Sequence, residues 1–413
     1  MPVRALFPCY RIAHQPSLPP QHRQSLNVDS AEMNQLDRKE GAVSQLAQRS
    51  RRYGAPMKND RWLLNIVAPN FEPDTVGGAG EVMIQLIGNF LRLHPNLRIY
   101  LNENAATFFP QWRGRIVEIR TGKMRGNAAK AAAMLRLGVS GKGLPREGVT
   151  WFPFGTMLPF HFNGKGVVTI HDTLDRDFPR CVPFLERKLR RFMIPRTLKR
   201  CAVVTSSQFS QERIRWYYGV ESTVIPLAPI PLPSPAAAIV PAKPHVFYAA
   251  NAWPHKNHEF LLRMWREDAR LREIPLVFTL GSGLGALGSS IARCKAHGVE
   301  IYITGRLSRS ELALYYQSAL CSVLPSLYEG FGLTAQESLL ANCPALVSDR
   351  TSLTETVPSD YPYVLPLETR VWTETILALR IAPKQDFRKW ASRTTWVEAA
   401  GKYLEVLDEV RGV

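Results

Sequence analysis

Short apolar runs alternate with amphipathic segments along most of this chain, and that alternation constrains its fold more than any other feature. In the first half, apolar runs occur at 62–69, 97–102, 149–154 and 166–172, with a helical pattern at 81–94. In the second half, they occur at 245–251, 275–281, 299–305, 321–326 and 344–349, with helical patterns near 257–270 and 309–319. Continuous apolar strands separated by helices are typical of βαβ units, whose parallel sheets are covered on both faces. The sequence therefore predicts an α/β protein with doubly wound sheets.

The chain has 413 residues, enough for two domains, and a proline-rich segment separates the two series of strands. We predict a first domain at 58–226, a linker at 227–244 and a second domain at 245–380. The remaining segment, 381–413, is expected to be helical and able to pack back on the first domain. Residues 1–57 are polar and carry no sustained period, so we expect a disordered extension. Because Met57 directly precedes the first strand, we expect this extension to be dispensable.

The composition, with 45% hydrophobic and 21% charged residues, is that of a soluble globular protein. No stretch approaches the roughly 20 apolar residues of a membrane-spanning helix, so we expect a cytoplasmic protein that can also bind peripherally to a membrane. The six cysteines stand alone, without a paired spacing or a histidine at ligand distance. We therefore predict no metal centre.

The net charge of +17 attracts nucleic acid, anionic lipid and phosphorylated small molecules alike. Two basic clusters lie in the first half: Arg113, Arg115, Arg120, Lys123, Arg125, Lys130, Arg136, Lys142 and Arg146, then Arg187, Lys188, Arg190, Arg191, Arg196, Lys199 and Arg200. They lack any recognisable nucleic-acid-binding motif, so we do not expect nucleic acid as the partner. A solvated basic face and an anionic membrane surface both remain open.

The segment from Leu324 to Ala341 carries the sharpest chemical pattern. An apolar strand is followed by a glycine-rich turn, and a helix is predicted to begin near Leu333. Backbone N–H groups at such a helix start form an anion site at the carboxyl end of the strand. Glu329 stands at the turn, and Glu337 lies about five residues into the helix, roughly 7 to 8 Å along its axis at about 1.5 Å per residue. A diphosphate at the helix start with a ribose diol at Glu337 fits that spacing.

This segment resembles the retaining glycosyltransferases of family 4, whose signature is a Glu-x7-Glu pair around a Gly-Phe-Gly turn. The resemblance runs through most of residues 60–350. It implies the GT-B fold, in which two Rossmann-like doubly wound domains face each other across a cleft. It also implies that Glu329 contacts the donor sugar and Glu337 the ribose, beside the backbone of Phe331, Gly332 and Leu333. The sequence departs from the family at Thr334, where proline is common, and at Asn342, where glycine is common.

A second segment, 248–257, ends a predicted strand and opens a helix. The resemblance implies that Lys256 on this loop binds the diphosphate, where an ammonium group can stabilise the charge of the leaving group. An arginine that is frequent in the family is replaced here, with Asn251 near its place. An ordinary exposed lysine is the alternative interpretation of Lys256.

A third candidate is His171, which with Asp172 ends the apolar run at 166–172. The resemblance implies that His171 faces the reacting side of the donor sugar; a core histidine that donates to a backbone carbonyl is the alternative. The glycine-rich turn before the helix at 81–94 matches the family loop that closes over the diphosphate, which makes Gly78 and Gly80 candidates. Asp175 and Asp177 have a spacing that can hold a divalent cation, but we expect a solvated loop there and no metal.

Together these residues predict a hexosyltransferase that takes its sugar from a nucleotide-diphosphate donor and needs no cofactor or metal. The expected partners are the nucleotide sugar and a glycan or lipid-diphosphate acceptor, as in polysaccharide or glycolipid biosynthesis. The segments around His171 and Lys256 look most like the mannosyltransferase branch, so GDP-mannose is a candidate donor. The alternatives are a sugar-nucleotide epimerase or hydrolase of the same architecture and, less compatible with the sequence, a basic nucleic-acid-binding protein.

Overall fold

The computed structural model describes residues 62–73, 77–119, 147–157, 162–235, 240–281, 284–383 and 385–412. The residues from Arg61 to Val413 form one compact unit. Outside the described residues lie the predicted extension at 1–57 and most of the first basic cluster, namely Arg120, Lys123, Arg125, Lys130, Arg136, Lys142 and Arg146.

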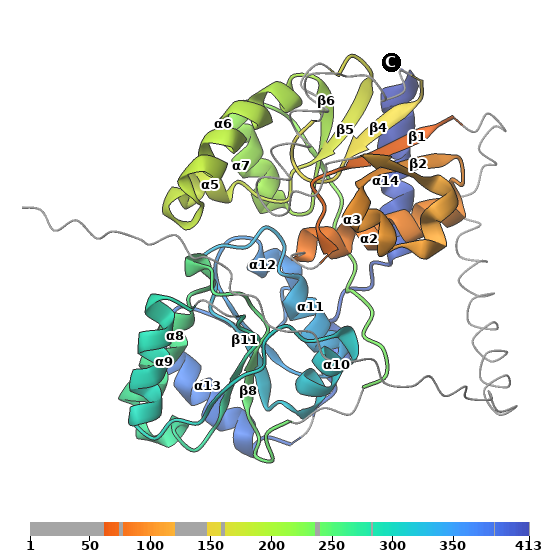
Figure 1. Ribbon diagram of the computed structural model, residues 1–413. Coiled ribbons are helices and arrows are strands. Elements are labelled where there is room, and N and C mark those ends of the chain that lie inside the picture. Colours follow the sequence, from red (N-terminus) through yellow and green to blue (C-terminus); the bar gives the residue numbers. More distant parts are fainter. Residues whose placement is uncertain are drawn as a thin grey trace, which may run out of the picture. The chain divides into compact units, whose positions relative to one another are not determined.

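The first sheet has seven parallel strands within the described residues, in the order β3-β2-β1-β4-β5-β6-β7. The strands are β1 (Leu64–Ala68), β2 (Leu97–Asn102), β3 (Ile116–Ile119), β4 (Val149–Phe152), β5 (Lys165–Thr169), β6 (Cys201–Thr205) and β7 (Thr223–Val224). The helices of this lobe are α2 (Gly78–Leu93), α3 (Glu103–Thr107), α5 (Leu174–Asp177), α6 (Phe184–Leu198) and α7 (Gln208–Tyr218), with 3-10 turns η3 (Pro110–Arg115) and η4 (Pro179–Cys181). The helices α6 and α7 cover one face of the sheet, and α2 covers the other (Figure 1). We call this part the first lobe.

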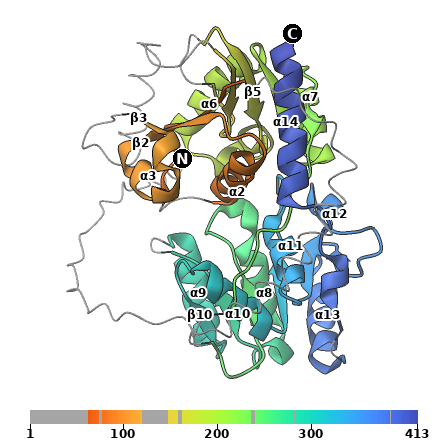
Figure 2. The same cartoon turned by 90° about the vertical axis from the view of Figure 1, so that its right-hand side faces the viewer.

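The last helix, α14 (Trp396–Gly412), packs beside α2 on the first sheet (Figure 2). Tyr403 lies fully buried in that core, and its hydroxyl is 3.1 Å from Thr169 Oγ1. The Trp151 indole donates to the same threonine oxygen at 2.9 Å. At the far end of α14, Lys165 Nζ donates to the Arg411 carbonyl at 2.5 Å. The end of the chain therefore completes the core of the first lobe.

The second sheet has six parallel strands within the described residues, in the order β10-β9-β8-β11-β12-β13. They are β8 (Val246–Tyr248), β9 (Leu276–Phe278), β10 (Ile301–Ile303), β11 (Cys321–Leu324), β12 (Ala345–Ser348) and β13 (Val364–Leu365). The helices are α8 (His258–Glu267), α9 (Ala286–Ala296), α10 (Arg309–Ser318), α11 (Leu333–Leu340), α12 (Leu353–Thr356) and α13 (Thr369–Ile381), with 3-10 turns η5 (Pro254–Lys256), η6 (Ala269–Leu271) and η7 (Phe387–Trp390). We call this part the second lobe.

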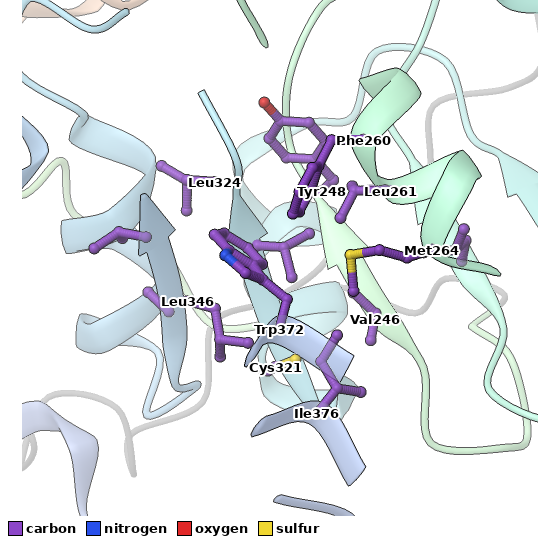
Figure 3. Close-up of a cluster of buried hydrophobic side chains, with 14 of the residues drawn as sticks. Val246, Tyr248, Phe260, Leu261, Met264, Cys321, Leu324, Leu346, Trp372 and Ile376 are labelled. Carbon is purple, nitrogen blue, oxygen red and sulfur yellow. The ribbon is translucent and has the colours of Figure 1, made fainter. Parts of the chain in front are cut away.

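The core of the second lobe forms where α8 and α13 cover β8, β11 and β12 (Figure 3). Phe260 of α8 and Trp372 of α13 meet edge to face, with ring centroids 5.5 Å apart. Phe387 and Trp390 of η7 belong to the same core. The predicted α/β fold with two doubly wound parallel sheets is confirmed. Each predicted apolar run overlaps an observed strand, whereas β3, β6, β7 and β13 were not predicted.

Asn342 shows why the family prefers glycine at this position. It follows α11 with a φ of 64°, in the left-handed region that glycine adopts most easily and asparagine tolerates. The asparagine side chain compensates, because its Oδ1 accepts a hydrogen bond from the Phe387 N–H at 2.7 Å. This substitution therefore ties the end of α11 to η7.

Candidate active site

The predicted anion site lies at the point where the strand order of the second sheet reverses, between β8 and β11. In open parallel sheets, ligands bind beyond the carboxyl ends of the strands at such a switch point. The helix α11 begins at Leu333, as predicted, and Gly332 precedes it with a φ of 93°. Its first N–H groups therefore start at the carboxyl edge of the sheet.

Glu329 and Lys256 form an ion pair at this edge. Lys256 Nζ lies 2.7 Å from Glu329 Oε1 and 2.8 Å from Oε2, and the hydroxyl of Ser326 donates to Oε1 at 2.7 Å. The side chains are mostly buried, with 20% of Lys256 and 11% of Glu329 exposed. The backbone of Glu329 is also held, because its N–H donates to Thr351 Oγ1 at 3.0 Å. Two residues that lie 73 positions apart thus share one charged site.

Lys256 is positioned by the short turn η5 after β8. The hydroxyl of Tyr248 donates to the Lys256 carbonyl at 2.6 Å, and Asn257 Nδ2 donates to the Pro325 carbonyl at 3.0 Å. The loop after β8 is therefore fastened to the end of β11. Asn251 lies earlier in this loop and is exposed; its side chain accepts from the Trp253 N–H at 3.4 Å.

Glu337 lies on α11 with its side chain 5% exposed, and it pairs with Arg309. Arg309 Nη1 donates to Glu337 Oε1 at 2.7 Å, and Nη2 donates to the carbonyl of Ile230 at 3.0 Å. Burial raises the pKa of the Glu337 carboxyl, and the charge of Arg309 opposes that shift. Sequence reasoning missed Arg309, although a glutamate on the inner side of a helix implies a cationic partner.

Gly330 makes the closest approach of the turn to the first lobe. A Cβ atom at this position would lie 2.2 Å from the His171 carbonyl oxygen, so the position requires glycine. The Gly330 carbonyl accepts from Ser207 Oγ at 2.8 Å and from Ser206 and Ser210 Oγ at 3.3 Å. These serines lie at the start of α7, where Ser207 is the N-cap residue. Their contact with Gly330 was not predicted.

His171 lies two residues beyond β5, beside Gly330. Its Nε2 is 2.9 Å from the Pro153 carbonyl, which can only accept, so Nε2 carries the proton. Burial lowers the pKa of His171, whereas the charge of Asp172 raises it. The lowered pKa favours the neutral imidazole, in which the unprotonated Nδ1 is an acceptor. The alternative interpretation of the sequence, a histidine that donates to a backbone carbonyl, therefore applies to Nε2.

Gly78 and Gly80 lie in the first turn of α2, whereas the sequence placed them before the helix. A Cβ on Gly78 would lie 3.3 Å from Leu333 Cδ1, so this turn packs against the start of α11. Gly80 is buried. Phe331 and Leu333 are partly buried against the core of the first lobe.

Tyr328 connects the turn to the loop after β5. Its hydroxyl accepts from the Thr173 N–H at 2.9 Å, and its ring packs edge to face with Phe178 and Phe209. Glu355 of α12 makes a second connection, because its carboxylate accepts from the N–H groups of Gln208 and Phe209 at 2.7 Å each. A carboxylate at the N-terminus of α7 is stabilised by the helix dipole.

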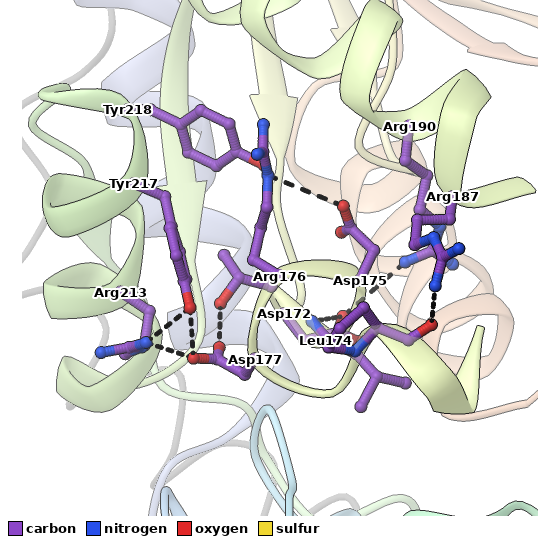
Figure 4. A network of polar contacts seen from close by, with 12 residues as sticks. Asp172, Leu174, Asp175, Arg176, Asp177, Arg187, Arg190, Arg213, Tyr217 and Tyr218 are labelled. Carbon is purple, nitrogen blue, oxygen red and sulfur yellow. Dashed lines mark hydrogen bonds and ion pairs between the residues drawn. The ribbon is translucent and has the colours of Figure 1, made fainter. Parts of the chain in front are cut away.

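The aspartates near His171 form polar contacts with other residues and not with each other (Figure 4). Asp177 is bonded to Arg213 and accepts from the hydroxyls of Tyr217 at 2.9 Å and Thr173 at 2.7 Å. Asp175 is fully buried, which raises its pKa. No group of three or more potential metal ligands occurs in the described part of the chain. Asp177 is thus engaged as a structural acceptor.

A cavity of about 610 Å³ lies elsewhere, near the amino ends of β4 and β5, where Gly148, Lys165 and Arg411 line it. None of the predicted site residues lines this cavity. Among the helices that the structure describes, none is both long and apolar enough to span a membrane.

Comparison with known proteins agrees with this geometry. Residues 234–366 match the profile of the family described as glycosyl transferases group 1. The chain is 26% identical over 221 residues to the O-antigen chain mannosyltransferase RfbU of Salmonella typhimurium, covering 52% of this chain and 61% of that protein. It is 32% identical over 131 residues to a GDP-mannose-dependent phosphatidylinositol dimannoside mannosyltransferase of Mycobacterium tuberculosis, covering 30% of this chain and 34% of that protein. The matches thus span less than two thirds of either relative.

Solved structures share the fold at low sequence identity. WaaG, a glycosyltransferase involved in lipopolysaccharide biosynthesis, superposes with a TM-score of 0.61 at 14% identity, covering 85% of this chain and 100% of that one. Anabaena HepE, solved with UDP and glucose, superposes with a TM-score of 0.62 at 14% identity, covering 84% and 99%. These similarities support the GT-B arrangement of two Rossmann-like lobes.

Proposed function

We propose that this chain, of which residues 234–366 match the glycosyl transferases group 1 profile, is a glycosyltransferase of that family that moves a hexosyl group from a nucleotide-diphosphate donor to a glycan or lipid-linked acceptor. GDP-mannose is the donor we propose first, because both curated relatives are named mannosyltransferases and one is named GDP-mannose-dependent. The observation that carries the proposal is the cluster of Lys256, Glu329 and Ser326 at the start of α11, with Glu337 farther along the same helix.

Each of these groups has a part in the proposed reaction. The N-terminus of α11, at Gly332 and Leu333, binds the diphosphate together with Lys256, so that negative charge on the leaving group is stabilised. Glu329 accepts hydrogen bonds from the sugar hydroxyls, and Glu337 accepts from the ribose diol. Each carboxylate would accept hydrogen bonds from the ligand hydroxyls while it remains paired with its cation, which is Lys256 for Glu329 and Arg309 for Glu337.

The reaction we propose retains the anomeric configuration. The bond between the anomeric carbon and the phosphate oxygen breaks through an oxocarbenium-like state, while the acceptor hydroxyl attacks from the same face. The hydroxyl proton passes to the departing phosphate oxygen, so no carboxylate nucleophile is required. The neutral ring of His171 lies beside the Gly330 turn and faces the reacting side of the sugar. Asn251 and the first turn of α2, with Gly78 and Gly80, complete the diphosphate surroundings.

The first step in testing this function is to identify the donor that the chain binds. Thermal-shift titration of the full chain against GDP-mannose and other nucleotide sugars should identify a stabilising donor, because a ligand that binds only the folded state raises its stability. The chain is then incubated with that donor and candidate lipid-linked acceptors, and transfer is followed by product analysis. Release of free sugar with no dependence on acceptor would favour a hydrolase, and epimerised donor an epimerase.

The proposal includes independence from metal. The positive charge of Lys256 and the dipole of α11 supply the electrostatic stabilisation that a divalent cation supplies in other transferases. Transfer activity should therefore persist in excess chelator. Loss of activity in chelator, restored by Mg²⁺ or Mn²⁺, would contradict this part.

A further inference from the structure

Helix α6 has two different faces. Its inner side chains Met193, Ile194 and Leu198 are buried in the first-lobe core, on the side of the sheet away from α14 (Figure 1). Its outer face carries large apolar side chains that remain exposed: 61% of Phe184, 78% of Leu185, 39% of Leu189 and 48% of Phe192.

These four exposed residues form one stripe. Positions 184, 185, 189 and 192 are spaced by one, four and three residues, which places them on the same side of an α-helix. Single exposed apolar residues need no explanation, but a contiguous apolar stripe marks an interaction surface. Within the described residues, no other helix exposes more than one large apolar side chain.

Positive charge surrounds the stripe. Lys188, Arg191 and Arg196 are exposed on α6. Lys188 Nζ lies 4.6 Å from the ring centre of Phe184, and the Arg196 guanidinium lies 3.5 Å from that of Phe192. The one acidic residue of the helix, Glu186, is paired with Arg190 at 2.7 Å.

We propose that α6 is an interfacial helix that docks the first lobe on an anionic lipid bilayer. An amphipathic helix with aromatic and leucine residues on one face and cations around them binds in the plane of the membrane surface. The apolar side chains enter the acyl boundary, while lysine and arginine reach the lipid phosphates. A second copy of the chain fits this face less well, because the like charges around the two stripes would repel.

The inner side of the same helix lies near the candidate active site. Arg190 is 3.8 Å from Asp172, which directly follows His171 in the chain. A bilayer bound to the outer face of α6 would therefore lie about one helix diameter, roughly 10 Å, from the strand end that carries His171, within reach of a lipid-linked acceptor. This last step rests on the proposed function, whereas membrane docking does not.

The experiment is sedimentation of the full chain with phosphatidylcholine vesicles that contain or lack phosphatidylglycerol, at low and high salt, without donor or acceptor. One variant, Leu185→Gln with Phe192→Gln, removes apolar contacts. A second, Lys188→Gln with Arg191→Gln and Arg196→Gln, removes charge. The control is Ile381→Gln at the end of α13, where the isoleucine is 86% exposed in the second lobe.

Binding is expected only with phosphatidylglycerol, and salt should weaken it. The partition coefficient should fall about fivefold for each cation removed and about tenfold for each apolar side chain removed, while Ile381→Gln should bind like the native chain. Circular dichroism checks that the variants are folded. Native binding that is absent, or that survives both α6 variants, overturns the proposal. So does a change of oligomeric mass in the α6 variants with vesicle binding intact, which would assign this face to a second copy.

Discussion

Replacing Lys256 separates the chemical role that we propose for this lysine from its structural role. The lysine pairs with Glu329 through two contacts, at 2.7 and 2.8 Å, and both side chains are mostly buried. Lys256→Gln would leave the Glu329 carboxylate with the Ser326 hydroxyl as its remaining side-chain donor. The variant should therefore lose stability as well as turnover, and the two losses have different causes.

The stability loss can be estimated from the burial of the pair. Breaking a fully buried ion pair costs roughly 3 to 5 kcal/mol. Because a fifth of the Lys256 side chain still meets solvent, we expect about 2 kcal/mol here. The loss of turnover should be about 3 kcal/mol, roughly a hundredfold, as for removal of one preorganised electrostatic donor. Lys256→Arg should recover part of the activity, since it keeps the charge.

The double variant Lys256→Gln with Glu329→Gln separates the two effects. It removes both charges, so the free energy of unfolding should return most of the way to the native value, whereas turnover should stay low. The assays are denaturant unfolding and steady-state transfer with the donor found by thermal shift. If Lys256→Gln keeps near-native transfer, the lysine has no part in the chemistry, and the start of α11 is left as the proposed phosphate site.

Three further changes test other parts of the structure. Glu337→Ala should weaken binding of the bare nucleoside diphosphate in calorimetry, because it removes the proposed ribose acceptor; unchanged affinity would exclude that role. Burial lowers the pKa of His255 and of His258 to about 4, so below about pH 6.5 the unfolded chain binds protons that the folded chain does not. The free energy of unfolding should fall between pH 6.5 and 4 by up to about 1.4 kcal/mol per pH unit for each histidine, and replacing both with phenylalanine should flatten this slope. Gly330→Ala should cost roughly 2 kcal/mol in thermal unfolding, whereas Gly401→Ala, with nothing within 4 Å of its Cβ, should not destabilise.

The fold could be predicted from the sequence because its signals are local. The strands of the second lobe from β8 to β12 lie within short, mainly apolar runs, and the period changes where the next helix begins. The start of α11 was predicted correctly for the same reason, since Gly332 in the left-handed region ends the turn. The edge strand β3 was among those missed, because none of its four residues is fully buried and Glu118 interrupts its apolar pattern.

The partners of the site residues could not be predicted in the same way. Glu337 and Arg309 are 28 positions apart, and Ser207 and Gly330 are 123 positions apart. Nothing in the local pattern of either segment specifies such a contact, which depends on the topology of two sheets. The chemistry of a residue indicates only the type of its partner. A buried carboxylate implies a cation, and a turn that packs closely against another backbone implies glycine.

Three consecutive residues after β11 join the candidate site to the first lobe. Tyr328 accepts from the Thr173 backbone, Glu329 holds Lys256, and Gly330 lies against the carbonyl of His171. Because these residues share one backbone segment, a displacement of one changes the positions of the other two. A ligand that shifts the backbone of Glu329 would therefore act on the contacts between the lobes, and a change at those contacts would act on Glu329. The same turn thus provides a physical route by which donor binding can be coupled to the position of His171.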